Sequence, residues 1–232
     1  MKPIRSENLR RVLKLAVPFV LIPGVIVLGS LAFRDRFYAW ISLVIVLLSQ
    51  VLFLAGFEKR TVGTRRMVIA AVMTALSVLG RFLFAAIPGF KPITAMVVIT
   101  AIWLGGETGF LVGSLSAVIS NFLFGQGPWT PFQMLAWGMI GLIAGYLQKP
   151  LKKSRLWLSV YGALAGVSYS LCMDVWTVVW YNESFSWPLY TAALVSSLPH
   201  TLSYAVSNVV FLLFLGRPFG EKLERIRIKY GV

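Results

Sequence analysis

Residues 93–124 read ITAMVVITAIWLGGETGFLVGSLSAVISNFLF, two apolar runs joined by a short polar turn at 106–108. Small residues recur there at every fourth position, in the series Ala101, Gly105, Gly109, Gly113 and Ala117. In lipid no hydrophobic force drives helices together, so they associate through close backbone contact. Small residues at this spacing give a helix one flat side. The stretch therefore predicts an all-α integral membrane protein with tightly packed middle helices.

The rest of the chain has the same character. Hydrophobic residues make up 58% of the 232 residues and charged residues 13%, whereas a soluble domain carries about a quarter charged residues. This composition excludes a disordered chain, a collagen-like chain and an ordinary cytosolic enzyme. Apolar runs of spanning length mark membrane helices. Eight runs qualify: 13–33, 38–57, 67–87, 93–106, 109–124, 134–148, 156–180 and 189–216.

The charged residues predict how these eight helices are oriented. The chain has 22 Lys and Arg against 8 Asp and Glu, and Lys and Arg accumulate on the cytoplasmic side of short loops. If the N-terminus is inside, nearly all the cations fall on cytoplasmic segments. Only Arg34, Arg36 and Lys91 lie on outer loops, and Arg81 lies within a run. We therefore expect a multi-pass protein of the plasma membrane with both termini cytoplasmic. Its basic charge faces anionic lipid, and no nucleic-acid partner is expected.

Small residues also divide the chain into parts. Four-residue series recur at Gly141 and Gly145, at Gly162, Gly166 and Ser170, and at Ala71 and Ala75, but the first two runs have none. We therefore expect a two-helix N-terminal membrane extension (1–60), a six-helix substrate-binding core (61–216) and a basic cytoplasmic tail (217–232).

Two features predict a binding site at the outer end of the core. The loops 88–92, 125–133 and 181–188 combine proline with aromatic residues, which makes them stiff and rich in flat apolar area. Polar side chains also lie inside the runs, where an arginine costs about 2.5–3.5 kcal/mol and is expected to face protein or a wet cavity. The candidate substrate-binding residues are Arg81, Phe84, Lys91, Asn121, Gln126, Trp129, Gln133, Asp174, Tyr181, Asn182 and His200.

Purely structural roles for these residues also stay open. Arg81 and Asp174 form either a structural ion pair or a ligand anchor, and the loop aromatics also suit a belt at the lipid–water boundary. His200 suits the role of a satisfied core histidine. Glu107, in the turn between two runs, is expected to cap a helix or to meet a partner.

The chain lacks the common signatures of catalysis. Cys172 is the single cysteine and His200 the single histidine, so a disulfide framework and a thiolate metal cluster are excluded. No G-x-S-x-G, H-E-x-x-H or Walker sequence is present. We expect neither an enzyme nor a chain that binds a metal or cofactor. Two alternatives stay open: a self-sufficient permease or channel, and a membrane enzyme that uses Asp174 and His200.

The stretch 80–147 resembles the substrate-specific membrane subunit, or S component, of an energy-coupling factor (ECF) vitamin transporter. The most specific parts are Ser120-Asn121, the run GQGPWTPFQM at 125–134 and Trp137-Gly138. The resemblance covers the core, about 67–216. It implies that the chain captures a micronutrient from outside the cell. It also implies an ECF transmembrane scaffold subunit and two cytoplasmic ATPases as partners, which use ATP to drive release inward.

The resemblance further assigns roles within the core. Ala71 and Ala75 match the family's Ala-x-x-x-Ala motif, which meets the scaffold. The three outer loops are expected to cover the ligand. The run at 125–134 looks most like cobalamin-type members, so cobalamin or a related corrinoid is the first expectation. Riboflavin, a pterin or a queuosine precursor also suits a site with few acids, one buried arginine, aromatics and amides. The N-terminal helix pair departs from the six-helix pattern of the family.

Overall fold

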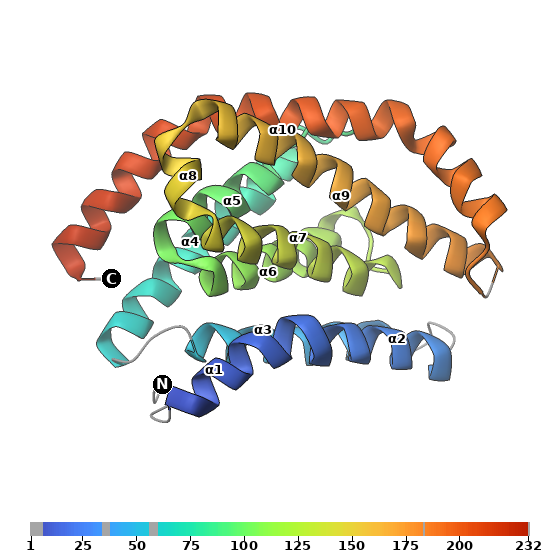
Figure 1. Cartoon of the computed structure of the whole chain (residues 1–232), viewed down its shortest axis with the longest axis horizontal. Helices are drawn as coiled ribbons and strands as arrows, with labels where there is room; N and C mark the ends of the chain where they lie inside the picture. The colour runs from blue at the N-terminus through green and yellow to red at the C-terminus, as the bar shows by residue number, and fades with distance from the viewer. Residues whose placement is uncertain (1–6, 34–37, 56–59, 183, 232) are drawn as a thin grey trace.

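The computed structural model describes residues 7–33, 38–55, 60–182 and 184–231, and every element in these ranges is a helix (Figure 1). Each of the eight predicted runs lies largely within one helix or one unbroken helical stretch, which confirms the all-α fold. Lys2, Arg5, Arg34, Arg36 and Lys59 lie outside the described residues. The elements are α1 (Glu7–Ala16), a π-helical turn η1 (Val17–Leu21), α2 (Ile22–Phe33), α3 (Tyr38–Ala55), α4 (Arg60–Leu83), α5 (Ile93–Leu104), α6 (Gly106–Phe124), α7 (Trp129–Tyr146), α8 (Gln148–Lys153), α9 (Arg155–Asn182) and α10 (Trp187–Tyr230).

Five helical stretches of the described chain are long and apolar enough to cross a membrane. They are Glu7–Gly29, Thr64–Leu83, Gly106–Phe124, Arg155–Asn182 and Trp187–Tyr230. Two further apolar helices, Trp40–Phe53 and Ile93–Leu104, are shorter. The chain is therefore a multi-pass membrane protein, while the count of eight spans and the orientation of the termini stay predictions.

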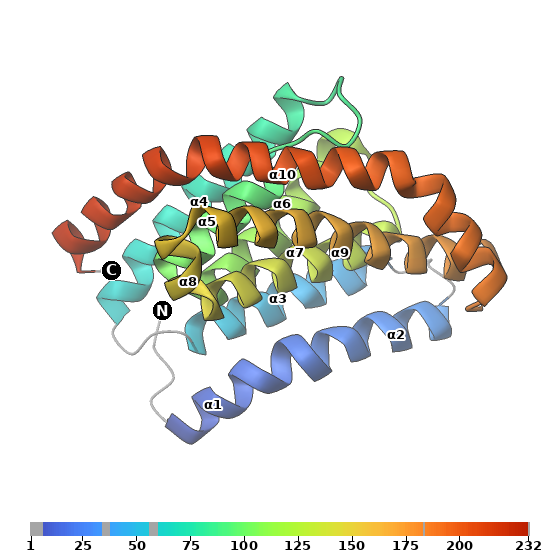
Figure 2. The same ribbon diagram turned by 45° about the horizontal axis from the view of Figure 1, so that its top comes forward.

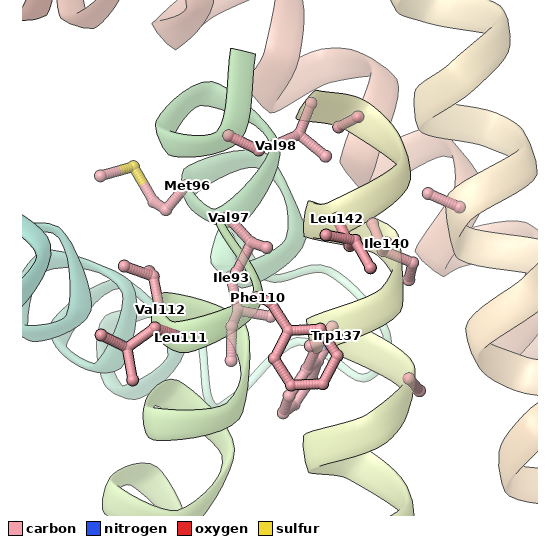
Figure 3. Packing of buried hydrophobic residues seen from close by; sticks show 14 of the residues in the cluster. Ile93, Met96, Val97, Val98, Phe110, Leu111, Val112, Trp137, Ile140 and Leu142 are labelled. Carbon is pink, nitrogen blue, oxygen red and sulfur yellow. The ribbon is translucent and has the colours of Figure 1, made fainter. Parts of the chain in front are cut away.

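Helix α5 lies at the centre of the core. All of its residues except Trp103 are buried, and its 12 residues rise only about 18 Å, less than the roughly 30 Å of a bilayer core. Because protein rather than lipid surrounds α5, it does not have to match the bilayer thickness. Ile93 and Val97 of α5 pack near Phe110 of α6 and Trp137 of α7 (Figure 3).

The predicted close packing of α6 and α7 is confirmed at their glycines. A Cβ atom at Gly113 would lie 2.5 Å from the carbonyl oxygen of Trp137, and one at Gly141 would lie 2.6 Å from the carbonyl carbon of Gly109. Helices α9 and α10 meet in the same way, since a Cβ atom at Gly166 would lie 2.8 Å from the Cα atom of Ala205. Backbone contact therefore holds the core together, as in other membrane bundles.

The N-terminal helices form a layer against one side of the core (Figures 1 and 2). Helix α3 packs on α6 and α7 and buries Ile45, Leu52 and Phe53. Helix α1 joins the core through an ion pair of 2.8 Å between Lys14 Nζ and Glu107 Oε1. Glu107, expected to cap a helix or meet a partner, therefore has a partner within this chain.

Helix α10 continues past Arg217, where the sequence suggested the last run ends and a tail begins. It spans 44 residues through Pro199 and Pro218, about 66 Å at the α-helical rise. Leu223 is buried, and Gly220 lets the backbone contact the ring of Trp103. At its end, Arg65 of α4 donates a hydrogen bond to the carbonyl oxygen of Tyr230. Packing on the core thus keeps the basic segment helical.

Candidate functional site

Arg81 is buried near the end of α4, well away from the basic start of that helix. Its Nη1 donates to Asn121 Oδ1 over 2.9 Å and to Ser120 Oγ, both on α6. The guanidinium carbon lies 4.7 Å from the ring centroid of Phe124 and 5.4 Å from that of Trp137. Both hydrogen bonds use Nη1, so the rest of the five-donor fork is left for other acceptors.

The ion pair of Arg81 with Asp174, one of the two roles left open by the sequence, is not formed. Among the described residues neither side chain takes part in an ion pair. Asp174 Oδ2 instead accepts a hydrogen bond of 2.8 Å from Ser197 Oγ of α10. Arg81 is instead held by a neutral amide and a hydroxyl on α6 through Nη1 alone, while the Asp174 hydrogen bond joins α9 to α10.

A chain of amides carries the hydrogen bonding onward from Arg81. Asn121 Nδ2 donates to Thr130 Oγ1 and to Gln133 Oε1, each over 2.8 Å. Gln133 Nε2 then donates to the Tyr169 hydroxyl over 3.1 Å. Helices α4, α6, α7 and α9 are thereby joined through buried polar side chains. A network of this kind is rigid when its members are satisfied.

Stacked aromatic rings lie beside this polar chain. Trp137 stacks on Tyr169 at 4.8 Å between centroids, and Tyr169 on Tyr204 at 4.9 Å. The His200 ring continues the series at 5.9 Å from Tyr204. Trp137 Nε1 and Thr94 Oγ1 each donate to the Tyr204 hydroxyl, over 3.0 and 3.2 Å. The four rings come from α7, α9 and α10 and form one column.

The loop between α4 and α5 covers one side of the column by lying on α10. Ser203 Oγ donates to the carbonyl oxygen of Pro88 over 2.9 Å, and the Lys91 amide donates to Ser207 Oγ over 2.8 Å. Gly89 has a φ of 71°, and a Cβ atom there would lie 3.0 Å from the carbonyl oxygen of His200. A larger residue at 89 would therefore be strained and would push the loop off α10.

Lys91 brings a second cation to the region. Its Nζ lies 5.7 Å from the ring centroid of Phe124, whose ring also contacts Arg81. Burial and the positive charge of Arg81 lower the pKa of Lys91. Phe84 contacts Phe211 of α10 at 5.0 Å between centroids and lies at the edge of the same loop. The loop thus presents one cation and a cluster of phenylalanine rings.

The loop at 125–133 supports the site from the other side. Gln126 Nε2 donates to the carbonyl oxygen of Val118 over 2.7 Å, and its Oε1 accepts from Thr130 Oγ1 over 3.0 Å. Gln126 therefore braces the loop. Trp129 packs edge-on against Trp176 of α9 at 5.8 Å, which extends the aromatic surface toward α9.

The structure brings some of the predicted residues together and leaves others apart. Arg81, Asn121 and Gln133 share one hydrogen-bonded chain, and Phe124 links Arg81 to Lys91. Phe84, Gln126, Trp129, Asp174 and His200 flank this cluster.

Tyr181 and Asn182 do not join it. Tyr181 is 80% exposed, and the Asn182 side chain bonds to Ser184 two residues on. They lie at the end of α9, which extends beyond α4–α7 together with the start of α10 (Figure 1). Sequence reasoning missed Tyr169 and Tyr204 and did not assign Trp137 to the site. The available signal was their polar ring atoms within apolar runs.

This arrangement gathers groups of the kinds that recognise a flat polar molecule. The guanidinium and amide groups supply hydrogen bonds, the ring column supplies flat apolar faces, and Lys91 supplies positive charge at the edge. No group of three or more His, Cys, Asp or Glu side chains in the described ranges is placed to hold a metal ion.

A separate apolar groove runs between α4 and α6. Its volume is about 580 Å³, and its only polar side chain is that of Thr74. Ala71 and Ala75 are both exposed and both line it. Leu79 and Phe82 also line it with more than half of their surface exposed, so α1–α3 leave this face open.

The model of a family described as "ECF-type riboflavin transporter, S component" matches residues 61–217. The match covers α4 to α9 and most of α10, and leaves out α1–α3. No curated protein and no solved structure matches the chain.

Proposed function

Since the chain belongs to the S components of ECF-type riboflavin transporters, we propose that it captures a vitamin outside the cell and delivers it to an ATP-driven ECF module. Membership of this family implies vitamin uptake together with a membrane scaffold and ATPase subunits. The observation that carries the proposal is the buried chain Arg81–Asn121–Gln133–Tyr169 beside the Trp137–Tyr169–Tyr204 column. Small-molecule sites combine apolar rings with a few fixed polar groups, and these residues supply both.

The proposed orientation puts this site outside. Arg65, Arg66, Lys152, Lys153 and Arg155 lie at the starts of α4 and α9 and in α8, at the opposite end of the bundle. By the positive-inside rule that end faces the cytoplasm. Arg81, near the other end of α4, then faces the outer leaflet and the medium.

Riboflavin is the first substrate to test. A flavin ring is flat, stacks on aromatic side chains, and carries carbonyl oxygens and ring nitrogens that can accept hydrogen bonds from a guanidinium. The aromatic rings of the column and the donors of Arg81 that Ser120 and Asn121 do not use are groups of these kinds, and a flavin that stacks on Tyr169 or Tyr204 must displace a neighbouring ring. The name of the matching family supports the same choice. Cobalamin, suggested by residues 125–134, stays a prediction; its much larger ring system requires the outer loops to open further.

The groove on α4 and α6 is the proposed docking face for the scaffold subunit. It is apolar, faces lipid and contains the Ala71–Ala75 pair. Small side chains let a partner helix approach closely, which is the main attraction available between helices in lipid. The N-terminal helices pack elsewhere on α6 and α7, so one side of the core is free for the partner.

The division of labour is tested by reconstitution. Vesicles containing this chain alone are compared with vesicles containing the chain, scaffold and ATPases, with labelled riboflavin outside and ATP inside. We expect accumulation only in the second set and only with ATP. Flux through the chain alone, without ATP, would contradict the proposal and support a self-sufficient permease.

A further inference from the structure

A second cleft lies at the basic end of the bundle, remote from Arg81. Its volume is about 320 Å³ and it opens between α5, α8, α9 and α10. Trp103 of α5 forms one wall, and Gly216 and Gly220 lie on the α10 side. The Trp103 ring lies where a Cβ atom of Gly220 would project. The ring therefore packs directly against the backbone of α10, and this contact fixes its position.

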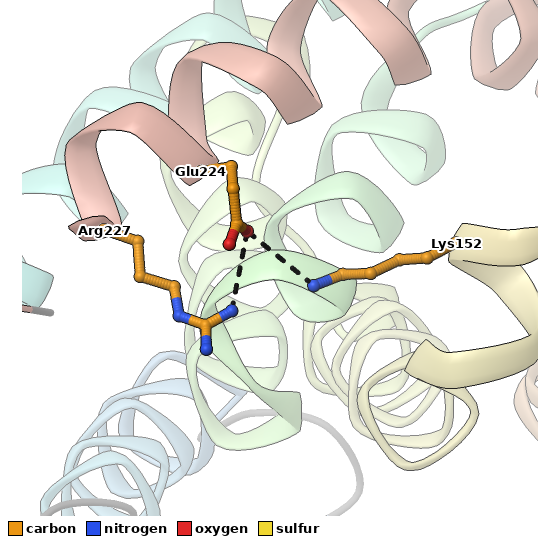
Figure 4. A network of polar contacts seen from close by, with 3 residues as sticks. All are labelled: Lys152, Glu224 and Arg227. Atoms are coloured by element: carbon orange, nitrogen blue, oxygen red, sulfur yellow. Dashed lines mark hydrogen bonds and ion pairs between the residues drawn. The ribbon is translucent and has the colours of Figure 1, made fainter.

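Four cations line this cleft: Lys152, Lys153, Arg155 and Arg217. Two carboxylates, Glu221 and Glu224, line it as well. Glu224 is shared, because its Oε2 lies 3.9 Å from Lys152 Nζ and 3.5 Å from Nη1 of Arg227 (Figure 4).

The other three cations are left for an external anion. Within the described part of the chain Lys153, Arg155 and Arg217 form no ion pair. Lys152 also reaches over Trp103, with its Nζ 5.1 Å from the ring centroid. The cleft therefore carries a net positive charge, with cations from three helices.

The start of α9 adds to this charge. The 28-residue helix begins at Arg155 on the rim of the cleft. Ser154 Oγ accepts from the Trp157 amide, and the Ser154 carbonyl oxygen accepts from the Leu158 amide. The amides at 155 and 156 have no intrahelical acceptor and carry the positive end of the helix dipole, an arrangement that favours phosphate.

The surroundings of the cleft match a lipid better than a soluble anion. Leu156 and Trp157 follow Arg155 on α9, and Phe214 lies about one turn before Arg217 on α10; they are 71%, 59% and 79% exposed. Exposed apolar side chains of this size are suited to contact with lipid acyl chains. A phospholipid that placed its phosphate between Arg155 and Arg217 would lay its acyl chains along these residues. A soluble phosphate would leave them uncovered.

We propose that this cleft binds the phosphate of an anionic phospholipid from the leaflet on the basic side of the membrane. Basic pockets between membrane helices on the cytoplasmic side are suited to anionic headgroups. The proposal goes beyond vitamin capture and does not depend on which vitamin binds. It assigns a lipid site to the junction of α8, α9 and α10; Tyr169 lies on α9 and His200 on α10.

The test uses the full chain purified in detergent. Lipid binding is measured by native mass spectrometry and by the shift in melting temperature, with dioleoyl phosphatidylglycerol compared with dioleoyl phosphatidylcholine. The cleft variant is K153Q/R155Q/R217Q. The matched control, K222Q/R225Q/K229Q, removes the same charge from exposed positions on α10 outside the cleft.

We expect phosphatidylglycerol to bind more tightly than phosphatidylcholine. The cleft variant should lose about tenfold in affinity for phosphatidylglycerol, and the control less than about threefold. Equal losses in the two variants would overturn the proposal in favour of diffuse surface charge. Stabilisation by inorganic phosphate equal to that by phosphatidylglycerol would overturn it in favour of a soluble anion.

A second measurement on the unmodified chain covers the case in which the cleft variant fails to fold. A phosphatidylglycerol analogue with a diazirine near its glycerol backbone is photolysed in the complex, and labelled peptides are mapped by mass spectrometry. Labelling should concentrate at 151–158 and 213–221. Labelling spread evenly along α10, or concentrated at 222–230, would contradict the proposed site.

Discussion

Nη1 of Arg81 on α4 lies 2.9 Å from Oδ1 of Asn121 on α6, and through Asn121 this hydrogen bond connects Arg81 to Gln133 on α7. The same guanidinium stacks over Phe124. A buried arginine held by neutral groups keeps its full charge for a ligand, because no carboxylate neutralises it. The first prediction follows from this relationship.

Arg81→Gln should lower ligand affinity by about tenfold to a hundredfold, the range expected for losing a charge-assisted hydrogen bond. Affinity is measured by fluorescence titration of the purified chain. Arg65→Gln is the control, because Arg65 lies at the other end of α4 and bonds to Tyr230. Equal affinity in wild type and Arg81→Gln would remove Arg81 from the site.

Tyr169 should act mainly through its ring. Tyr169→Phe removes the acceptor for Gln133 Nε2 and keeps the stack with Trp137 and Tyr204. Tyr169→Leu removes the hydroxyl acceptor and the aromatic stack. We expect a loss of a few-fold in riboflavin affinity for the Phe variant and about tenfold or more for the Leu variant. Flavin fluorescence, which stacking quenches, gives the readout. Equal losses in the two variants would show that the hydroxyl matters and the ring does not.

The double change Ala71→Trp with Ala75→Trp should block uptake and spare binding. Two indole rings fill the open groove between α4 and α6, so a partner helix can no longer approach. The control is Val195→Trp with Leu202→Trp, at exposed positions on α10 outside the groove. ATP-driven uptake of riboflavin and affinity for riboflavin are measured on the wild type, the Ala71/Ala75 variant and the Val195/Leu202 control. Normal uptake by the Ala71/Ala75 variant would contradict scaffold docking at this face.

The ion pair between Lys14 and Glu107 should fasten the N-terminal helices to the core. Glu107 is the more buried partner, and the charge of Arg66 also acts on it. Glu107→Gln therefore leaves two cations facing each other and should cost more stability than Lys14→Gln. We expect about 1 kcal/mol for Lys14→Gln, since Lys14 is partly exposed, or a melting temperature lower by about 2–4 °C.

The swap Lys14→Glu with Glu107→Lys tests the pair itself and should recover part of the loss. Glu7→Gln serves as the control, because Glu7 pairs with Arg11 on the exposed face of one helix; its melting temperature should stay near that of the wild type. A Lys14→Gln variant as stable as the wild type would show that the ion pair does not fasten α1.

Close packing of α6 on α7 should make Gly141→Ala destabilising. Its Cβ atom would lie 2.6 Å from the backbone of Gly109, and overpacking of this kind costs about 1–3 kcal/mol. Gly24→Ala on α2 is the matched control, with no other atom within 4 Å of the added Cβ. The melting temperatures of the two variants are compared, with thermal unfolding monitored by size-exclusion chromatography. A Gly141→Ala protein as stable as Gly24→Ala would contradict the close backbone contact.

The sequence predicts the helices of this protein well, because apolar runs and glycine spacing are local signals. The flat sides at Gly109, Gly113 and Gly141 meet as expected. The extension of α10 to Tyr230 was not expected. Its cause is tertiary, since Leu223 and Gly220 pack on the core at positions that look like an ordinary basic tail.

The candidate site was only partly predictable. Polar residues in apolar runs identified Arg81 and Asn121, because an unpaired polar group in lipid is costly, and the composition of the loop 125–133 identified Gln133. The same reasoning suggested an Arg81–Asp174 pair, which depends on distances between helices that no local pattern encodes. Tyr169 and Tyr204 resemble ordinary core aromatics in the sequence, and their stacking emerges only when α9 and α10 are placed together.

The most direct test of vitamin capture is a binding titration of the purified chain, expressed alone, against riboflavin, cobalamin and a panel of other vitamins. We predict saturable one-to-one binding of riboflavin with a dissociation constant below the micromolar range. Binding of cobalamin instead would still support vitamin capture. The substrate would then be the one suggested by the resemblance of residues 125–134 to cobalamin-type members. Failure of every panel member to bind a folded, monodisperse chain would contradict the proposal that this subunit captures a vitamin by itself.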